Sequence, residues 1–586
     1  MQLEDRMAKL MTLDRNQLND GADQELPLDS HFIEQAEYIP EADFQALSAV
    51  HPEEESIVRR LSVGGAKLLV GPRGCGKTTL LLKSYFGLLR DQETLTLPIY
   101  VNFKLSLKLE PLYINTPNAS FWFKLWLNLR VMEGLLASIR ESGRYQVPEG
   151  LPTDKEISSL INLIESGRVS SASSVEAFNT ESVADFIRDV LEENSLVRCV
   201  LLLDDAAHAF SSKQQEDFFE FFRQIKSREI SPKAAIYPGI TTYSATFHAG
   251  HDAEQIDVWV KPDNAGYVQF MRSLAEKRFG GQLPPTLVAT TDALEFLAFA
   301  SFGIPRSFLN MLRTIYHDES KLSAGSSLDR RKILEIAKQS RELSHNVYES
   351  LAYKLPAYRS FISAGQSVYQ RILSQIKAFN KLKDESNQAL EVGFRRPLPA
   401  DLEKVVSFFQ YAGLLMPVGE NSRGVKGVFD LYMVHFGDLI TENAIIGKRT
   451  KSISSFVTAF TAQTHQAWPR MSAESLVPEN ERAQLFRLAL PNCQVCGTER
   501  ASEQAKFCQN CGSQLKNTSV YEQLTGQDIS VLPLSKRMVK RIKENSTIRT
   551  VRDILIDNDR ANLRGIPMIG PVRTALISNY AEEHVA

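Results

Sequence analysis

The pattern of apolar and polar positions first becomes regular near residue 67. The apolar run 67–70 leads into a glycine-rich loop, and the apolar stretch 80–89 that follows is compatible with a helix. A second apolar run, Val197 to Leu203, has the length of a buried parallel strand and ends in two aspartates. Further strands are predicted at 97–107 and at 234–243. Together these segments indicate an α/β core.

Helical periodicity dominates the next regions. An insertion at about 118–180 begins with the stretch 119–142, whose crowded aromatic residues are expected in a core rather than on a partner-binding face. Residues 328–383 are strongly helical in pattern. The stretch 398–440 follows the order helix, Gly-Leu-Leu turn, strand, basic loop and strand, which is similar to a winged helix with its wing at 421–427. Such a module binds either DNA or protein.

Charge and hydropathy restrict the class of protein. The formal net charge is −3, so nucleic acid would have to be bound by local basic patches rather than by the whole chain. The N-terminus alternates charged and apolar residues and lacks the apolar centre of a signal peptide. No stretch is apolar for long enough to span a bilayer. We therefore expect a soluble, cytoplasmic protein with no membrane partner.

The glycine-rich loop fits the P-loop pattern of Gly, four residues, Gly, Lys, and Ser or Thr. Glycines let backbone N–H groups close around phosphate oxygens, and the following helix N-terminus adds positive potential. Lys77 would reach the β- and γ-phosphates of ATP, and Thr78 would hold Mg²⁺. The residues predicted to bind the nucleotide here are Gly71, Pro72, Arg73, Gly74, Cys75, Gly76, Lys77, Thr78 and Thr79.

The two aspartates that end the strand 197–203 complete this prediction. In a P-loop fold an acidic residue at this strand end orders Mg²⁺, directly or through water, so Asp204 is predicted to join Thr78 as a magnesium ligand. Asp205 is placed where a carboxylate could orient the attacking water. ATP and Mg²⁺ are therefore the expected cofactors at this end of the core.

Several stretches together resemble the origin-recognition-type branch of AAA+ ATPases and the related STAND NTPases. The resemblance rests on the P-loop, the apolar strand ending in Asp-Asp, the Thr-rich strand, and the stretches 256–264 and 302–312, and it covers about residues 41–316. It implies that Thr241 senses the γ-phosphate and that Arg306, in Gly-Ile-Pro-Arg, couples the nucleotide to a helical lid. The implied catalytic set is Lys77, Asp204, Asp205 and Arg306. Asp205 replaces the more common Glu, and no arginine finger is identified.

Four of the six cysteines form two Cys-x-x-Cys-Gly knuckles near the C-terminus. Their spacing allows four thiolates to close one tetrahedral site, so Cys493, Cys496, Cys508 and Cys511 are predicted to hold a structural Zn²⁺. The glycine after each pair permits a tight turn. Redox-active thiols are the alternative, although a thioredoxin-like context is missing.

The C-terminal segment resembles the C-terminal domain of the RNA polymerase α subunit and, more broadly, a helix-hairpin-helix fold. In such domains the hairpin and nearby basic residues hold nucleic-acid phosphates without reading sequence. The positions implied here are Arg537, Lys540, Gly570 and Arg573. Met568 stands where many DNA-binding hairpins have Gly, which keeps docking of a partner protein as the alternative.

The predicted fold class is an α/β P-loop core of AAA+ type with a helical lid, followed by winged-helix-like, zinc-ribbon and small all-α helical-hairpin domains. The predicted boundaries are an N-terminal arm at 1–40, the core at 41–260, the lid and linker at 261–385, the winged-helix-like domain at 386–450, a connector at 451–490, the zinc ribbon at 491–516 and the helical hairpin at 517–586.

The predicted function is that of an Mg-dependent ATPase of the AAA+/STAND type, with ATP binding more strongly indicated than hydrolysis. It would act as a nucleotide-dependent switch or loader on duplex nucleic acid, in replication, repair, transposition or defence against mobile DNA. The alternative is a slow ATP switch in signalling or scaffolding whose C-terminal modules bind a partner protein. A homo-oligomer is compatible with either role.

Overall fold

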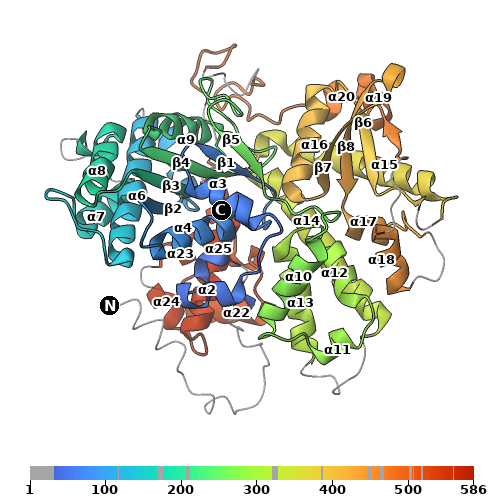
Figure 1. Cartoon of the computed structure of the whole chain (residues 1–586). Coiled ribbons are helices and arrows are strands. Elements are labelled where there is room, and N and C mark those ends of the chain that lie inside the picture. Colours follow the sequence, from blue (N-terminus) through green and yellow to red (C-terminus); the bar gives the residue numbers. More distant parts are fainter. Residues whose placement is uncertain are drawn as a thin grey trace. The chain divides into compact units, whose positions relative to one another are not determined.

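The computed structural model describes residues 32–33, 35–115, 118–167, 176–205, 211–319, 328–384, 387–446, 452–461, 467–500, 505, 507–515, 519–557 and 560–585 (Figure 1). Two compact units are distinguished, one running from residue 31 to 516 and one whose described residues lie between 519 and 585. Most of the predicted arm 1–40 therefore lies outside the described residues. No described helix combines the length and the apolar character needed to cross a bilayer.

The larger unit contains a parallel sheet of five strands in the order β2-β3-β4-β1-β5. The strands are β1 (Lys67–Val70), β2 (Thr96–Asn102), β3 (Arg198–Asp204), β4 (Ile230–Ile236) and β5 (Glu254–Asp257). Leu68 and Leu69 of β1 and residues 199–204 of β3 are buried in this sheet. The predicted α/β core is thus present, and its parallel strands direct the β1–α4 loop and the end of β3 to the same edge.

One predicted strand was placed too late in the sequence. The stretch 234–243 was expected to remain extended to about Thr241, whereas β4 ends at Ile236. Pro238 and Gly239 follow Tyr237 directly, and Gly239 adopts a φ of +77°, which breaks the extended backbone. As a consequence, Tyr237 and not Thr241 is the residue at the carboxyl end of the strand.

Helices cover the sheet, and the predicted helical insertion forms one layer of them. The helices are α3 (Glu54–Ser62), α4 (Lys77–Arg90), α6 (Ala119–Ser142), α7 (Asp154–Glu165), α8 (Thr180–Glu193) and α9 (Ser212–Ile225). Helix α6 passes so close to β2 that a Cβ at Gly134 would lie 2.7 Å from the carbonyl oxygen of Tyr100. Trp122, Phe123 and Trp126 are buried, as core packing predicted, whereas Phe121 is 44% exposed.

A helical region follows the sheet and shares one buried apolar cluster with the next module. Its helices are α10 (Tyr267–Arg278), α11 (Pro285–Val288), α12 (Ala293–Ala300), α13 (Pro305–Glu319), α14 (Arg330–Lys354) and α15 (Arg359–Asn380). This cluster includes both Phe308 of α13 and Phe409 of α16, so these two helices share one apolar core.

Within the module after α15, the helix, the turn and the two strands between residues 400 and 434 follow the order that the sequence predicts. It comprises β6 (Glu391–Arg395), α16 (Ala400–Ala412), β7 (Leu415–Ser422), β8 (Val428–Val434), α17 (Phe436–Thr441), α18 (Ile453–Thr461), β9 (Arg470–Met471), α19 (Ala473–Leu476) and α20 (Glu479–Leu485). Strands β7 and β8 form an antiparallel hairpin in a four-stranded sheet of order β7-β8-β6-β9. Gly413, with a φ of +75°, ends α16 at the predicted turn. The description of this module as a winged helix stays a prediction.

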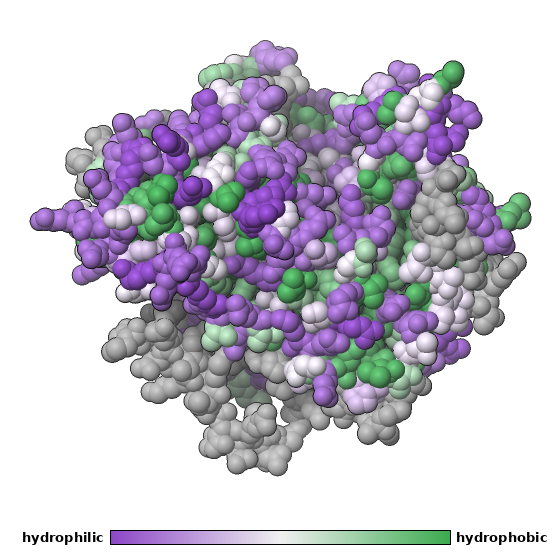
Figure 2. All heavy atoms as spheres, in the orientation of Figure 1, coloured by the Kyte–Doolittle hydropathy of each residue, from purple (hydrophilic) through white to green (hydrophobic). Residues whose placement is uncertain are grey.

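The face of the molecule shown in Figure 2 is mostly hydrophilic where it is coloured, with apolar residues in separate small patches.

The unit between 519 and 585 is all-helical in its described residues. Its helices are α21 (Val520–Thr525), α22 (Lys536–Asn545), α23 (Val551–Leu555), α24 (Ala561–Arg564) and α25 (Pro571–Val585). Its small core is formed by buried aliphatic side chains such as Ile542, Val551 and Leu563.

Candidate nucleotide-binding site and cysteine cluster

The P-loop lies between β1 and α4, where its sequence pattern predicts it. Strand β1 ends at Val70, and α4 begins at Lys77. Gly74 and Gly76 have φ values of +85° and +99°, in the left-handed region that favours glycine. A Cβ at Gly71 would lie 2.6 Å from the Cys75 sulfur. The loop therefore tolerates side chains poorly at the positions where backbone N–H groups would face phosphate.

Lys77 is the first residue of α4, and its side chain folds back against this loop and is 5% exposed. Its Nζ donates hydrogen bonds to the carbonyl oxygens of Gly71, at 2.8 Å, and Pro72, at 3.0 Å. It also lies 3.8 Å from the centroid of the Tyr237 ring, a cation–π contact. Burial lowers the pKa of Lys77. The ammonium group is thus held in place by carbonyl and aromatic partners that an incoming phosphate could replace.

The carboxyl end of β3 brings Asp204 to the same place. Asp204 is 1% exposed, and its Oδ2 accepts a hydrogen bond of 2.9 Å from the Tyr100 hydroxyl. Burial raises the pKa of Asp204 to about 7, with a further contribution from the neighbouring carboxylate of Asp205, while the Thr78 hydroxyl acts in the opposite direction. A buried carboxyl group beside a threonine hydroxyl is the donor set that Mg²⁺ takes in P-loop proteins.

Asp205 has an unusual backbone conformation. Its φ is +50°, in the left-handed region that few residues other than glycine, asparagine and aspartate adopt. Its backbone N–H donates to Asp204 Oδ1 at 3.0 Å, and its own Oδ1 accepts a 2.8 Å hydrogen bond from the Tyr237 hydroxyl. These contacts fix the orientation of the Asp205 carboxylate next to that of Asp204.

The lid helix α13 begins against the P-loop. The Arg306 backbone N–H donates to the Gly74 carbonyl oxygen at 3.3 Å, and a Cβ at Gly74 would be 3.0 Å from Arg306 Cβ. The turn before α13 needs Gly303, whose φ is +71° and whose Cβ would lie 2.1 Å from the carbonyl oxygen of Val260. The structure therefore brings Arg306 to the loop, where the family resemblance placed it.

Thr241, the predicted sensor residue, has a different role in the structure. Its hydroxyl donates to the Tyr237 carbonyl oxygen at 2.7 Å and so stabilises the turn after β4. Tyr237 occupies the strand end instead and contacts both Lys77 and Asp205. The signal in the sequence that could have identified Tyr237 is the pair Pro238 and Gly239, which favours a turn directly after it.

A further wall of the site comes from α16, more than 160 residues beyond β4 in the sequence. The Tyr411 ring packs against Tyr237 with centroids 5.7 Å apart. Lys404 Nζ donates to the Gly239 carbonyl oxygen at 2.9 Å, and a Cβ at Gly239 would be 2.3 Å from the Ser407 carbonyl oxygen. Nothing in the local sequence around Tyr411 indicates this contact, which depends on how α16 packs against the turn after β4.

The segment around residues 35–38 also reaches the site. Lys104, two residues beyond β2, contacts Glu37 Oε1 at 3.4 Å, the Gln35 amide oxygen at 3.2 Å and the Tyr38 hydroxyl at 3.1 Å. Burial raises the pKa of Glu37, Lys104 lowers it, and Asp205 raises it further. The carboxylates of Glu37, Asp204 and Asp205 thus influence one another, an association that the sequence did not reveal.

The four predicted cysteine ligands lie together. Their sulfur atoms are all within 4.8 Å of one another, with Cys493 and Cys511 at 3.5 Å and Cys496 and Cys508 at 3.5 Å. Tetrahedral zinc with bonds of about 2.3 Å would require sulfur–sulfur distances of about 3.8 Å. The four thiols could therefore hold one metal ion after a small adjustment.

The two knuckles have matching backbone geometry. Gly497 donates its N–H to the Cys493 carbonyl oxygen at 2.8 Å, and Gly512 donates to that of Cys508 at 2.9 Å. Both glycines have positive φ values, +73° and +69°. Each glycine thus closes the turn that directs a pair of sulfurs to the shared position.

The residues predicted to bind nucleic acid lie on two helical elements of the smaller unit. Arg537 and Lys540 are exposed on α22, and Lys540 approaches Glu544 at 3.7 Å. Gly570 directly precedes α25, and Arg573 in its first turn donates to the Met568 carbonyl oxygen at 2.8 Å. Met568 itself adopts a φ of +67° and is 64% exposed.

No family model matches the chain, and no curated protein matches it. Among solved structures, it is similar to the ORC1 protein of Aeropyrum pernix in complex with DNA, with 15% identity, 68% of this chain and 93% of that chain covered, and a TM-score of 0.29. It is also similar to CDC6P from Pyrobaculum aerophilum, with 12% identity, 73% of this chain and 97% of that chain covered, and a TM-score of 0.29. A third similar structure is domain III of the Thermotoga maritima replication initiation protein DnaA, with 12% identity, 53% of this chain and 98% of that chain covered, and a TM-score of 0.28. Similarities at this level do not assign the chain to a family.

Proposed function

We propose that the protein binds ATP with Mg²⁺ at the edge of the parallel sheet and uses the bound nucleotide as a conformational switch. The observation that carries this proposal is the meeting of Lys77, the Asp204–Asp205 pair and Arg306 around one glycine loop. These residues come from three separate elements, yet all lie at the carboxyl ends of the parallel strands, the edge at which open α/β sheets bind ligands.

The residues of the site fit a nucleotide phosphate chain and its metal. Backbone N–H groups of the loop and Lys77 would hold phosphate oxygens, and Thr78 and Asp204 would hold Mg²⁺. When bound, Mg²⁺ supplies positive charge that offsets the charge of the phosphates. Asp205, oriented by the Tyr237 hydroxyl at 2.8 Å, would orient a water molecule.

The contacts around Tyr237 support the switch. Lys77 lies on one face of the site with its ammonium over the Tyr237 ring, and Tyr411 of α16 packs against the same tyrosine. A phosphate that draws Lys77 away from its present partners would alter the surroundings of Tyr237 and, through it, the docking of α16. In this proposal, the nucleotide state and the position of α16 are coupled through the Tyr237 side chain.

The test of nucleotide binding compares Lys77→Ala with the wild-type protein by calorimetry. Loss of the charge-assisted contacts to phosphate should weaken ATP binding by about 100-fold. Lys213→Ala, which removes a half-exposed lysine of α9, is the matched control and should bind ATP normally. Unchanged ATP affinity in Lys77→Ala would refute the assignment of this site.

Hydrolysis is tested separately with Asp205→Asn. If Asp205 orients water, this variant should bind ATP with little change in affinity but turn it over more slowly, so that ATP remains bound. Single-turnover measurements with radiolabelled ATP distinguish the two steps. Equal turnover in both proteins would assign the role to another group, such as Glu37, whose carboxylate interacts electrostatically with that of Asp205.

We further propose that the cysteine cluster holds a structural Zn²⁺ and that the smaller unit binds duplex nucleic acid weakly through Arg537, Lys540, Gly570 and Arg573. Four sulfur ligands leave no open position on zinc, which favours a structural role. In a salt titration, each phosphate contact should contribute a slope of about −0.9 to the log–log plot for duplex DNA.

The nucleic-acid proposal is tested in the full chain with Arg537→Gln/Lys540→Gln. This variant should bind duplex DNA more weakly and with a shallower salt slope. The alternative is docking of a partner protein, which is favoured by the exposed apolar side chains Ile556 and Met568, 63% and 64% exposed. An unaltered salt slope in the variant would contradict nucleic-acid binding through these residues and would favour docking of a partner protein.

A further inference from the structure

A cleft of about 710 Å³ lies between α14 and the helices α17 and α18, away from the P-loop residues. Its volume falls in the range of about 300–1,000 Å³ that is usual for small-molecule sites. The residues that line it are Arg330, Arg331, Leu334, Glu335, Ala337, Lys338, Gly437, Ile440, Thr441, Asn443 and Phe456. The nucleotide site described above uses none of these residues.

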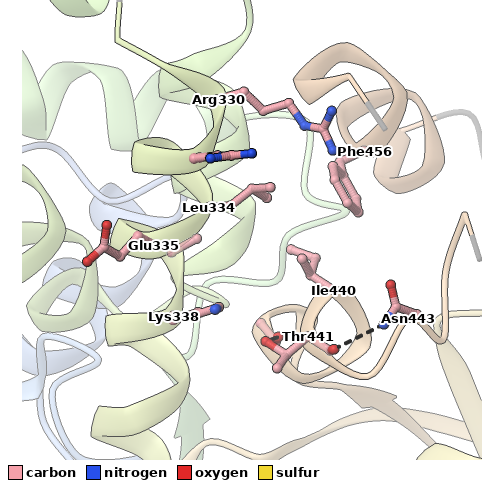
Figure 3. Close-up of a pocket in the computed structure, with 11 residues that line it drawn as sticks. Arg330, Leu334, Glu335, Lys338, Ile440, Thr441, Asn443 and Phe456 are labelled. Carbon is pink, nitrogen blue, oxygen red and sulfur yellow. Dashed lines mark hydrogen bonds between the residues drawn. The ribbon is translucent and has the colours of Figure 1, made fainter. Parts of the chain in front are cut away.

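One wall of the cleft is cationic. Arg330, Arg331 and Lys338 are exposed along the first turns of α14, and none of the three has an ion-pair partner within 4.0 Å among the described residues. Figure 3 shows Arg330 reaching across toward Phe456 and Lys338 pointing toward α17, whereas the Glu335 carboxylate points away from the cleft. Three positive charges therefore border the cleft with little compensation.

The opposite wall is neutral. Ile440 and Thr441 come from α17, Asn443 follows that helix, and Phe456 from α18 closes the end next to Arg330 (Figure 3). The Asn443 amide donates to the Thr441 carbonyl oxygen at 3.4 Å. This wall offers a hydroxyl group, an amide and aliphatic surface, which suit the uncharged polar part of a ligand.

The two walls are held at a fixed separation by a buried network. Asp438 of α17, fully buried, accepts hydrogen bonds from Arg341 Nε at 2.7 Å and His345 Nε2 at 2.9 Å, both on α14, and from the Tyr369 hydroxyl of α15 at 2.9 Å. Gly437 permits the close approach, since a Cβ there would lie 3.3 Å from Arg341 Cβ. The cleft is thus formed before any ligand binds, which lowers the entropic cost of binding.

The contrast along α14 indicates what the cleft binds. The cation nearer the middle of the helix, Arg341, pairs with Asp438, whereas the three cations that face the cleft have no ion-pair partner among the residues that the structure describes. Arg330 and Lys338 are separated by eight residues, or about 12 Å along the helix axis. A ligand that meets both needs several negative groups, and guanidinium and ammonium groups on one side select phosphates.

We propose that this cleft is a second ligand site, for a small molecule that carries two or more phosphates on a neutral polar body, the chemistry of a nucleotide. The phosphates contact Arg330, Arg331 and Lys338, and the neutral part faces Thr441 and Asn443. The cleft volume of about 710 Å³ suits a small ligand. The proposal does not depend on nucleotide binding at the P-loop.

The test uses full-length protein carrying Lys77→Ala, so that the P-loop does not contribute. Calorimetric titrations employ inorganic pyrophosphate, ADP and a 20-base-pair duplex as probes. Pyrophosphate and ADP should each bind at one site, and the added change Arg330→Gln/Lys338→Gln should weaken both by about tenfold or more, as expected for loss of two charge-assisted contacts. Arg359→Gln/Lys381→Gln, two exposed cations of α15 and its C-terminal end without ion-pair partners among the described residues, is the matched control and should leave binding unchanged.

Three results would overturn the proposal. One is absence of pyrophosphate and ADP binding at millimolar concentration, and the second is equal binding by the cleft variant and its control. The third is a loss confined to the duplex, which would make this wall a nucleic-acid surface. Because Arg330, Arg331 and Lys338 are exposed, their substitution should leave the fold intact, and circular dichroism checks this.

Discussion

The proposed nucleotide site and the cysteine cluster differ in how far apart along the chain their residues lie. The nucleotide site joins residues from Glu37 to Tyr411, whereas the four cysteines lie within 493–511. Each knuckle closes through a local hydrogen bond, which the glycine directly after its second cysteine donates to the carbonyl oxygen of its first cysteine. The nucleotide site depends instead on close approaches between distant segments, such as Gly303 on Val260 and Gly239 on Ser407. A local site can be recognised from spacing, and a distributed site only in part.

The largest expected effect concerns the local site. Cys508→Ser should lower the metal content from about one ion per chain to none, because structural zinc sites contribute about 10–16 kcal/mol of binding free energy. ATP affinity should stay unchanged, since the nucleotide site draws on other segments. Elemental analysis and calorimetry measure the two quantities. Loss of ATP binding together with the metal would show that the two regions are not independent.

The second largest effect is expected at the close approach of Gly303 to Val260, where one added side chain should lower the free energy of unfolding. Gly303→Val would place a Cβ 2.1 Å from the Val260 carbonyl oxygen at a φ of +71°, so we expect the free energy of unfolding to fall by about 3 kcal/mol or more. Gly143→Val is the control, since Gly143 has a φ of +63° but no atom within 4 Å of its Cβ. Urea denaturation compares them. Equal losses would attribute the effect to backbone strain alone.

The pH dependence of stability should expose the buried carboxyl group. Because the pKa of Asp204 is about 7 in the folded protein and the ordinary value is 3.8, the folded state keeps a proton that the unfolded chain has lost. Ligand-free protein should therefore lose stability as pH rises from about 4 through about 7, by up to about 4 kcal/mol from this residue. Asp204→Asn should remove that loss and be more stable than wild type at pH 8. Parallel pH profiles of the two proteins would contradict this assignment.

The smallest expected effect concerns Tyr237. Tyr237→Phe keeps the ring over Lys77 but removes the hydroxyl that donates to Asp205, so ATP turnover should fall by about five- to tenfold, equivalent to about 1 kcal/mol, with ATP affinity unchanged. Tyr243→Phe, outside the site, serves as the control. A change in affinity without a change in turnover would show that the ring and not the hydroxyl is the functional part.

The elements whose chemistry is local could be predicted from the sequence. The P-loop, the Asp204–Asp205 strand end and the cysteine knuckles depend on short-range order: a glycine that permits a left-handed backbone, an apolar run long enough to form a strand, a fixed spacing between thiols. The order of elements in 398–440 was predictable for the same reason. Gly413 ends its helix through its own left-handed backbone, which does not depend on how the neighbouring elements pack.

Which distant residues complete the site depends on tertiary packing and could not be predicted from the sequence. Thr241 was misplaced because a Pro-Gly turn outweighs the β-propensity of the residues after it, and Tyr237 therefore takes the strand end. The roles of Tyr411, Glu37 and Lys104, and the cationic cleft on α14, follow from how helices and strands far apart in the chain pack together. Such contacts carry no periodicity or spacing along the chain, since the packing of side chains between elements, not the local backbone, places them.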